Sequence, residues 1–216
     1  MREKYYSKKN ILEKSEQFRS ILENSGLSRG EYTIPSTTAL IVLDMQDYFL
    51  KPESHAFIPS AEAIIPRINL LIEEFNKRNM AKFYTQHIDQ NESEGMMGVW
   101  WNKNLLNENP LKSISSDLKI DKMQKITKSQ YDAFWNTELE KMLTKRSITD
   151  IIITGVMTHL CCETTARSAF VRGFNVIFTI DGTATYNEEH QMGSLRNLAH
   201  GFAHVETIEE VIKSLP

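Results

Sequence analysis

Residues 150–180 of the chain read DIIITGVMTHLCCETTARSAFVRGFNVIFTI. The opening run, Asp150–Thr154, is apolar and predicts a strand that is covered on both faces. Residues 158–172 have helical character, and Gly173 is well placed to end that helix. A second apolar run, Asn175–Ile180, follows at once. This order predicts two parallel strands joined by a helix.

Strands and helices alternate through the rest of the chain. Further strands are predicted at Thr38–Leu43, Ala81–Thr85, Lys125–Thr127 and His204–Glu206. Helices are predicted at Leu70–Asn79 with Pro66 in the first turn, from the capping pair Thr137 and Glu140 to about Arg146, from Asn187 to about Phe202, and from Thr207 onward. The fold class is therefore α/β: a three-layer α/β/α sandwich with a mostly parallel sheet of five or six strands.

We predict two parts of unequal size, an N-terminal helical extension at residues 1–30 and one domain at residues 31–216. The extension is highly charged and carries an apolar stripe at helical spacing, formed by Ile11, Leu12, Phe18, Ile21 and Leu22. Such a helix would lie on the domain or on a neighbouring subunit. Within the domain, residues 88–122 are polar and irregular, which is typical of a functional loop or lid.

The composition excludes several classes of partner. Hydrophobic residues make up 41% of the chain and charged residues 25%, which is enough apolar material for a full core. Twenty-five Lys and Arg oppose 28 Asp and Glu, so the net charge of −3 supplies no general attraction to nucleic acid or to an anionic membrane. The apolar runs are far shorter than the ~20 residues of a membrane span, and the N-terminus lacks the apolar core of a secretory signal.

The two cysteines, Cys161 and Cys162, are adjacent in the sequence. Neighbouring cysteines cannot staple distant parts of a fold, so they indicate a reducing compartment and leave a chemical role open. We expect a cytoplasmic protein.

Three reactive side chains follow predicted strands. Asp44 ends the first strand, Lys128 lies at the end of the third, and Cys161 follows the strand at residues 150–154. Ligands bind at the carboxyl ends of the strands in sheets of this kind. The sequence therefore places a carboxylate, an amine and a thiol where they can share one crevice.

Such a set suits nucleophilic catalysis. A free thiol has a pKa of ~8.5, but the start of a helix and a nearby lysine both favour the thiolate. A neighbouring carboxylate can accept the thiol proton and later donate it to a leaving nitrogen. Backbone N–H groups at the strand-to-helix turn can bind the oxyanion of a tetrahedral intermediate.

Three segments resemble the isochorismatase-like hydrolases, the superfamily of isochorismatases, nicotinamidases and carbamoylsarcosine amidase. They are LIVLDMQDYF at residues 40–49, KSQYDAF at 128–134, and IITGVMTHLCCETTARSAFVRGF at 152–174 followed by DGTAT at 181–185. The resemblance implies that Asp44, Lys128 and Cys161 are the family's catalytic triad. It also implies a cis peptide bond at Val156–Met157 and an oxyanion hole formed by the amides of Met157 and Cys161.

The resemblance leaves three functions to weigh. Members that act on isochorismate typically carry Gly at the position of Cys161, and a Cys at that of Cys162, and cleave a vinyl ether without a thiol. Because this chain keeps Cys161, we predict hydrolysis of a C–N bond in a small amide, imide or carbamoyl compound through a thioester on Cys161. The alternatives are vinyl ether hydrolysis with Asp44 as general acid, which releases pyruvate, and a non-catalytic binding module. Cys162 is interpreted as a helix-packing residue.

The sequence predicts no metal and no other cofactor. Nicotinamidases of the superfamily bind a metal through an Asp-x-His pattern after the second strand, together with a later His. The corresponding stretch here reads Thr85-Gln86-His87. Threonine is a poor replacement for a carboxylate ligand.

Further residues are predicted to contact the small-molecule substrate: Phe49, Gln86, His87, Trp100, Trp101, Tyr131 and His159. Gln46 is predicted to orient the carboxylate of Asp44. The family resemblance and the amphipathic N-terminal segment together predict a homo-oligomer, either a dimer or a tetramer.

Overall fold

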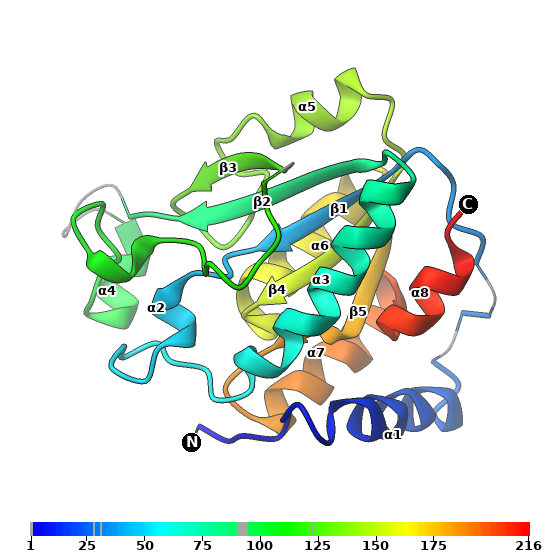
Figure 1. Cartoon of the computed structure of the whole chain (residues 1–216), viewed down its shortest axis with the longest axis horizontal. Helices are drawn as coiled ribbons and strands as arrows, with labels where there is room; N and C mark the ends of the chain where they lie inside the picture. The colour runs from blue at the N-terminus through cyan, green and yellow to red at the C-terminus, as the bar shows by residue number, and fades with distance from the viewer. Residues whose placement is uncertain (1, 28, 31, 90–94, 122) are drawn as a thin grey trace.

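Figure 1 shows the computed structural model of the chain, which describes residues 2–27, 29–30, 32–89, 95–121 and 123–216. Within these residues the central sheet has six parallel strands in the order β3-β2-β1-β4-β5-β6. The strands are β1 (Thr38–Leu43), β2 (Ala81–His87), β3 (Gln124–Lys128), β4 (Asp150–Val156), β5 (Asn175–Ala184) and β6 (His204–Glu206). The fold is the predicted α/β/α sandwich.

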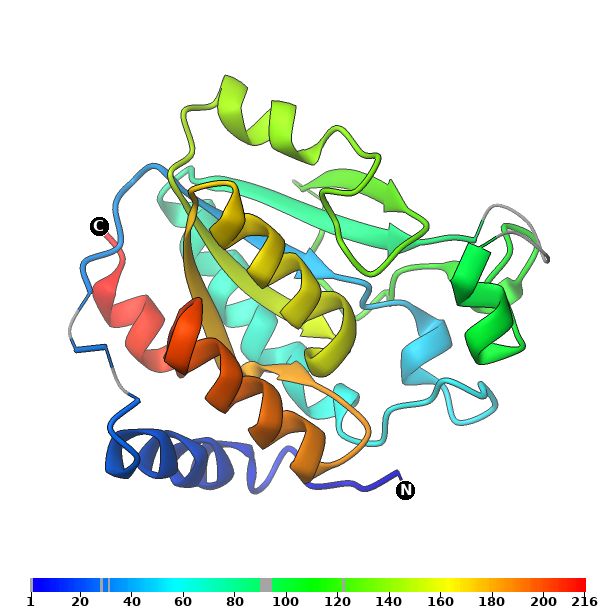
Figure 2. The same ribbon diagram turned by 180° about the vertical axis from the view of Figure 1, so that it is seen from behind.

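Helices cover both faces of the sheet (Figures 1 and 2). On one face lie α3 (Ala61–Lys77) and α8 (Ile208–Ser214), and on the other α6 (Glu163–Val171) and α7 (Glu188–Gly201). The remaining helices are α1 (Ile11–Asn24) beside α7, the short α2 (Asp47–Leu50) and α4 (Gly95–Trp101) near the carboxyl ends of the strands, and α5 (Leu139–Lys145) on the β2–β3 side. No helix in the described ranges combines the length and the apolar character that crossing a membrane requires.

The core follows from the sequence pattern. Every residue of β1 and β4 is buried, as expected for strands covered by helices on both faces. Helix α3 presents an apolar stripe to the sheet at helical spacing, formed by Ile64, Ile68, Leu71 and Phe75. The chain proceeds from β1 outward to β3 and then restarts at β4 on the other side of β1. The strand order therefore reverses between β1 and β4, the place where α/β sheets bind ligands.

The predicted strands are all present, while several helix boundaries differ from prediction. Helix α3 begins at Ala61, so Pro66 lies inside the helix instead of in its first turn. The helix predicted at residues 158–172 opens with a wide π-helical turn, Thr158–Cys162, before α6 begins. The loop at residues 88–122 contains α4 and a short 3-10 turn, Pro110–Lys112. Asn187 and Thr207 cap α7 and α8 as predicted.

The N-terminal segment packs against its own domain. Helix α1 buries Ile11, Phe18 and Leu22. Leu12 and Ile21, which were predicted to share this stripe, are exposed because they flank it on the helical wheel. Ahead of the helix, Tyr5 and Tyr6 insert into the core.

Gly155 is required by the close approach of β1 and β4. Its φ is +112°, and a Cβ atom added there would lie 2.0 Å from the backbone oxygen of Leu43. Backbone atoms of a central strand cannot move aside, so a larger residue would force the two strands apart.

We predict that Gly155→Ala lowers the free energy of unfolding by at least about 3 kcal/mol or prevents folding, because it combines backbone strain with a clash. Urea unfolding followed by circular dichroism measures the change. Gly193→Ala is the matched control, since Gly193 lies in α7 with open space around it. The control should be neutral or slightly stabilising; equal stabilities of the two variants would contradict the prediction.

Candidate active site

Asp44, Lys128 and Cys161 meet in the folded chain. The Nζ atom of Lys128 lies 2.7 Å from Oδ2 of Asp44 and 3.3 Å from Sγ of Cys161. All three are buried, with exposed fractions of 0%, 3% and 6% for Asp44, Lys128 and Cys161. The convergence predicted from the strand ends is therefore present.

The sheet topology creates this meeting. Asp44 follows β1 and Cys161 lies in the turn after β4, so the two flank the point where the strand order reverses. Asp44 has a φ of +51°, a left-handed conformation that aspartate tolerates better than most residues. Lys128 ends β3, two strands away from β1. That separation is about 10 Å, which the long lysine side chain can bridge.

Each charged group in the centre has further partners. The ammonium of Lys128 also donates to the backbone oxygen of Gln130 at 2.8 Å, which accounts for all three of its N–H donors. The second carboxylate oxygen of Asp44 accepts a hydrogen bond of 2.5 Å from the hydroxyl of Thr85. The same hydroxyl accepts from the backbone N–H of Asp44 at 3.1 Å. Thr85 therefore orients Asp44 from two directions.

Gln46 has a different role from the predicted one. Its side chain accepts from the backbone N–H of His87 and donates to the backbone oxygens of His87 and Lys112. It thus ties the segment after β1 to the end of β2 and to the loop that follows. The orienting role predicted for Gln46 belongs to Thr85.

The turn at residues 157–162, named the nucleophile turn after the role that the sequence predicts for Cys161, begins at the cis peptide bond Val156–Met157 implied by the resemblance. Backbone N–H groups of Leu160 and Cys162 both donate to the carbonyl oxygen of Met157 at 3.1 Å. Met157 and Cys161 both line the adjacent pocket. Cys162 is fully buried in the core, in line with its interpretation as a packing residue.

Burial dominates the electrostatics of the thiol. It raises the pKa of Cys161 to about 12, although the positive charge of Lys128 opposes the shift. Burial by itself lowers the pKa of Lys128, but the negative charge of Asp44 and the hydrogen bonds to Asp44 and Cys161 outweigh it and hold the pKa above its usual value. The ammonium is therefore charged, whereas the thiolate predicted from the sequence is not the resting form. The centre is better described as a protonated thiol beside an ammonium–carboxylate pair.

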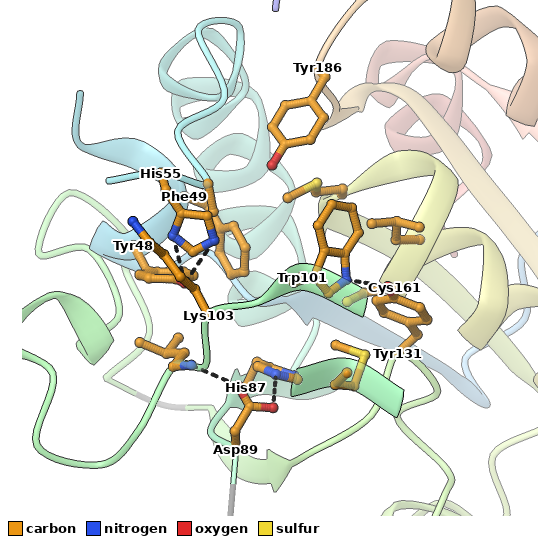
Figure 3. A pocket seen from close by; sticks show the side chains of 15 residues that line it. Tyr48, Phe49, His55, His87, Asp89, Trp101, Lys103, Tyr131, Cys161 and Tyr186 are labelled. Atoms are coloured by element: carbon orange, nitrogen blue, oxygen red, sulfur yellow. Dashed lines mark hydrogen bonds and ion pairs between the residues drawn. The ribbon is translucent and has the colours of Figure 1, made fainter. Parts of the chain in front are cut away.

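An aromatic pocket opens above the thiol (Figure 3). The space between its walls, together with the open solvent at its mouth, is about 530 Å³. Aromatic side chains form much of its wall: Tyr48, Phe49, Trp101, Tyr131 and Tyr186. Polar side chains also line it, namely His55, His87, Asp89 and Lys103. Such a pocket suits a flat, largely apolar compound with a few polar atoms.

Four of the predicted substrate-binding residues line this pocket: Phe49, His87, Trp101 and Tyr131. The indole N–H of Trp101 donates to the hydroxyl of Tyr131 at 2.6 Å. This bond links the loop at residues 88–122 to the segment after β3 and fixes two walls against each other.

The other three predicted residues lie outside the pocket lining. Trp100 is 73% exposed, because consecutive residues lie about 100° apart around a helix and only Trp101 is turned toward the pocket. Gln86 points away and donates to the backbone oxygen of Lys112. Nδ1 of His159 is hydrogen-bonded to the hydroxyl of Thr185 at 2.6 Å, and the ring stacks on that of His190. Burial lowers the pKa of His159 to about 4, so its ring is neutral near pH 7.

His87 lines the pocket and has one paired and one unpaired ring nitrogen. Its Nε2 atom lies 3.0 Å from the Asp89 carboxylate, which also accepts from the backbone N–H of Leu105. Burial raises the pKa of Asp89, but these two hydrogen bonds outweigh it and lower the net pKa. Asp89 is thus an acceptor and Nε2 of His87 the donor. Nδ1, on the other side of the ring, is buried and has no hydrogen-bond partner among the described residues.

The residues present do not fit the metal site known from nicotinamidases. The hydroxyl of Thr85 is already engaged with Asp44, and His87 is paired with Asp89. In the described ranges, no three His, Cys, Asp or Glu side chains gather closely enough to hold a metal ion. The absence of a metal stays a prediction.

The comparison with protein families settles the relationship. The isochorismatase domain model matches residues 38–210. The chain belongs to the isochorismatase family. It is therefore an isochorismatase-family hydrolase with an all-parallel α/β/α fold.

Individual relatives agree with this assignment. The chain is 35% identical to nicotinamidase 3 of Arabidopsis thaliana, over 82% of this chain and 88% of that protein. It is 26% identical to N-carbamoylsarcosine amidase of an Arthrobacter species, over 82% and 70% of the two chains. Its structure matches that of a cysteine hydrolase from Pseudomonas syringae with a TM-score of 0.81 and 28% identity, over 85% and 95% of the two chains. Amide hydrolysis is thus represented among the relatives.

Sequence reasoning missed several residues of the site. Thr85 was considered only as a poor metal ligand, and its position opposite Asp44 depends on the register of β1 with β2. Tyr48 belongs to the motif at residues 40–49, which does not by itself indicate that the side chain lines a pocket. Tyr186 and Lys103 reach the pocket from segments whose paths the sequence does not reveal.

The raised pKa of Cys161 predicts how its reactivity depends on pH. We expect the rate of iodoacetamide labelling of Cys161 in the folded protein to rise about tenfold per pH unit from pH 7 to 9, because only the thiolate reacts and its pKa is about 12. Mass spectrometry of tryptic peptides measures the rate. In urea, where the thiol is exposed, the rate should level off once the pH exceeds the ordinary thiol pKa of ~8.5. A plateau below pH 8 in the folded protein would contradict the prediction.

Proposed function

We propose that the protein hydrolyses a C–N bond of a small amide, imide or carbamoyl compound by covalent catalysis through Cys161. The observation that carries the proposal is the contact of one ammonium, that of Lys128, with both a carboxylate and a thiol at the inner end of the pocket. The resemblance to nicotinamidase 3 and N-carbamoylsarcosine amidase supports amide chemistry.

The first half of the reaction forms a thioester. The sulfur of Cys161 attacks the substrate carbonyl carbon while Asp44 accepts the thiol proton, so that a free thiolate is never required. The carbonyl oxygen becomes an oxyanion, which accepts hydrogen bonds from the amides of Met157 and Cys161. Asp44 then donates its proton to the leaving nitrogen, the C–N bond breaks and the amine departs.

The second half regenerates the thiol. Asp44 removes a proton from a water molecule, and the resulting hydroxide attacks the thioester carbon. The C–S bond breaks, the sulfur recovers the proton from Asp44, and the carboxylic or carbamic acid leaves. Lys128 is charged in the resting centre, where the carboxylate of Asp44 and the hydrogen bond to Cys161 hold its pKa above the usual value. Its role is to stabilise negative charge on either neighbour.

The pocket supports a small, flat substrate. Trp101, Tyr131 and Phe49 offer aromatic faces, and Nδ1 of His87 offers a polar ring atom that has no partner among the described residues. We propose that these four residues fix the plane and the orientation of the amide before attack.

Replacing the nucleophile gives the sharpest test. Cys161→Ala should lower kcat at least about a thousandfold on any amide that the native protein hydrolyses, because it removes the attacking atom. Cys162→Ala is the matched control and should retain activity, since its side chain is buried in the core. A screen of nicotinamide, N-carbamoyl amino acids and small ureides with ammonia detection finds the substrate, and intact-mass spectrometry detects the acyl-enzyme.

Two other outcomes would replace the proposal. If Cys161→Ala retains activity on isochorismate while Asp44→Ala loses it and pyruvate appears, the reaction is vinyl ether hydrolysis with Asp44 as general acid. If neither class of substrate is turned over and compounds still bind in the pocket, the protein is a binding module on the same fold.

The assembly, the location and the metal dependence of the protein can be tested separately. We propose a homo-oligomer, either dimer or tetramer, which light scattering tests. We propose a cytoplasmic location, which fractionation of cells tests. We also propose that no metal takes part, so dialysis against EDTA should leave turnover unchanged.

A further inference from the structure

The N-terminal segment is linked by hydrogen bonds to the nucleophile turn although it lies outside the matched family domain, residues 38–210. Figure 2 shows it running beneath α7 on the side of the molecule where α6 begins. Its Tyr5 is buried in the core with its ring against those of Tyr6 and Phe18. The hydroxyl of Tyr5 accepts from the backbone N–H of Thr185 at 2.9 Å and donates to the side-chain oxygen of Gln191 at 3.0 Å.

Gln191 joins this hydroxyl to the nucleophile turn. Its Oε1 atom also accepts a hydrogen bond of 2.6 Å from the hydroxyl of Thr158, the residue between Met157 and His159. Its Nε2 atom donates to the backbone oxygens of Ile180 and Thr183. Both hydroxyls must therefore be donors to Oε1, which leaves one consistent arrangement of the network. Tyr5, Thr158 and Gln191 are all buried, so water does not compete for these bonds.

A second path runs through Thr185. Its backbone N–H donates to Tyr5, and its hydroxyl bonds to Nδ1 of His159 in the nucleophile turn. The next residue, Tyr186, lines the substrate pocket, and its backbone oxygen accepts from the N–H of Glu3 at 2.7 Å. The N-terminal segment thus holds two consecutive residues at the end of β5 as well as the turn after β4.

The chemistry explains why such support matters. The turn supplies both the sulfur and the backbone amides that face the oxyanion, and catalytic groups must be held within a fraction of an ångström of the productive geometry. Burial raises the pKa of Tyr5 well above its usual value, so its hydroxyl stays a donor at any physiological pH. The support is therefore permanent and does not titrate.

We propose that Tyr5 is a positioning residue of the active site, which acts through Gln191 and Thr185 to hold the nucleophile turn, residues 157–162. The N-terminal segment would then be part of the catalytic apparatus as well as a cover for the sheet. This inference rests on the proposed function for its effect on turnover, but its structural content can be tested separately.

The test compares Tyr5→Phe with Tyr32→Phe. Each change removes one tyrosine hydroxyl and keeps the ring, but Tyr32 bonds to Asp150 at the opposite end of β4. We expect Tyr5→Phe to lower kcat about fivefold or more with KM nearly unchanged, the loss that corresponds to one buried hydrogen bond. Tyr32→Phe should leave kcat unchanged, although its melting temperature should be similar to that of Tyr5→Phe.

A double-mutant cycle locates the effect. Thr158→Val removes the hydroxyl that donates a hydrogen bond to Gln191, while Thr158→Ser keeps this hydroxyl. We expect Thr158→Ser to retain kcat, and Thr158→Val combined with Tyr5→Phe to lose less than the product of the two single losses, because both act on one network. Multiplicative losses would show that Tyr5 acts elsewhere and would overturn the inference.

Hydrogen exchange separates this inference from the proposed function. Mass spectrometry should show faster amide exchange at residues 157–162 in Tyr5→Phe than in Tyr32→Phe, whether or not a substrate is known. Equal exchange in the two variants overturns the inference and leaves the proposed function intact. If exchange is faster in Tyr5→Phe but the native protein turns over no amide, the inference is supported and the proposed function is rejected.

Discussion

The buried contact of Lys128 with Asp44 is the interaction on which the candidate site depends. Removing an ion from water costs several kcal/mol, and attraction in the interior compensates only when the remaining donors and acceptors are also satisfied. Here the ammonium has three partners and the carboxylate a second donor in Thr85. An isolated lysine or aspartate at either position would be strongly destabilising. The pair persists because both members and their partners are present together.

Burial of this centre also determines the state of the thiol. Cys161 lies in the same dry centre, where burial raises its pKa to about 12 and the ammonium lowers it only in part. A protonated thiol beside a carboxylate that can accept its proton needs no preformed thiolate. In the proposed mechanism the charge develops only when a carbonyl carbon is within reach, which would protect the sulfur from unwanted reactions.

The order of the strands explains why these groups are neighbours. Asp44 and Cys161 leave the sheet on either side of the reversal point between β1 and β4, and the lysine crosses from β3. The substrate pocket opens at the same edge, where the segment after β1, the loop at residues 88–122 and the end of β5 supply its walls. Gly155 permits β4 to approach β1 closely at this point. Architecture and chemistry thus share one location.

Sequence reasoning was most successful where a pattern is local. Buried strands, the caps Asn187 and Thr207, and reactive residues at strand ends could be predicted because each depends on a few neighbouring residues. It failed where the answer depends on a distant segment. Which of Trp100 and Trp101 lines the pocket depends on how α4 packs. That Thr85, and not Gln46, orients Asp44 depends on strand register.

The amino-acid order alone determined the family, the α/β architecture and the identity of the three converging groups, because short-range patterns and motifs carry that information. Tertiary structure decided which side chains face the pocket, and it holds the thiol in its protonated form. It also brings Tyr5, from outside the family domain, to the nucleophile turn. Such properties arise from burial and from contacts between residues far apart in the chain, and no local pattern encodes either.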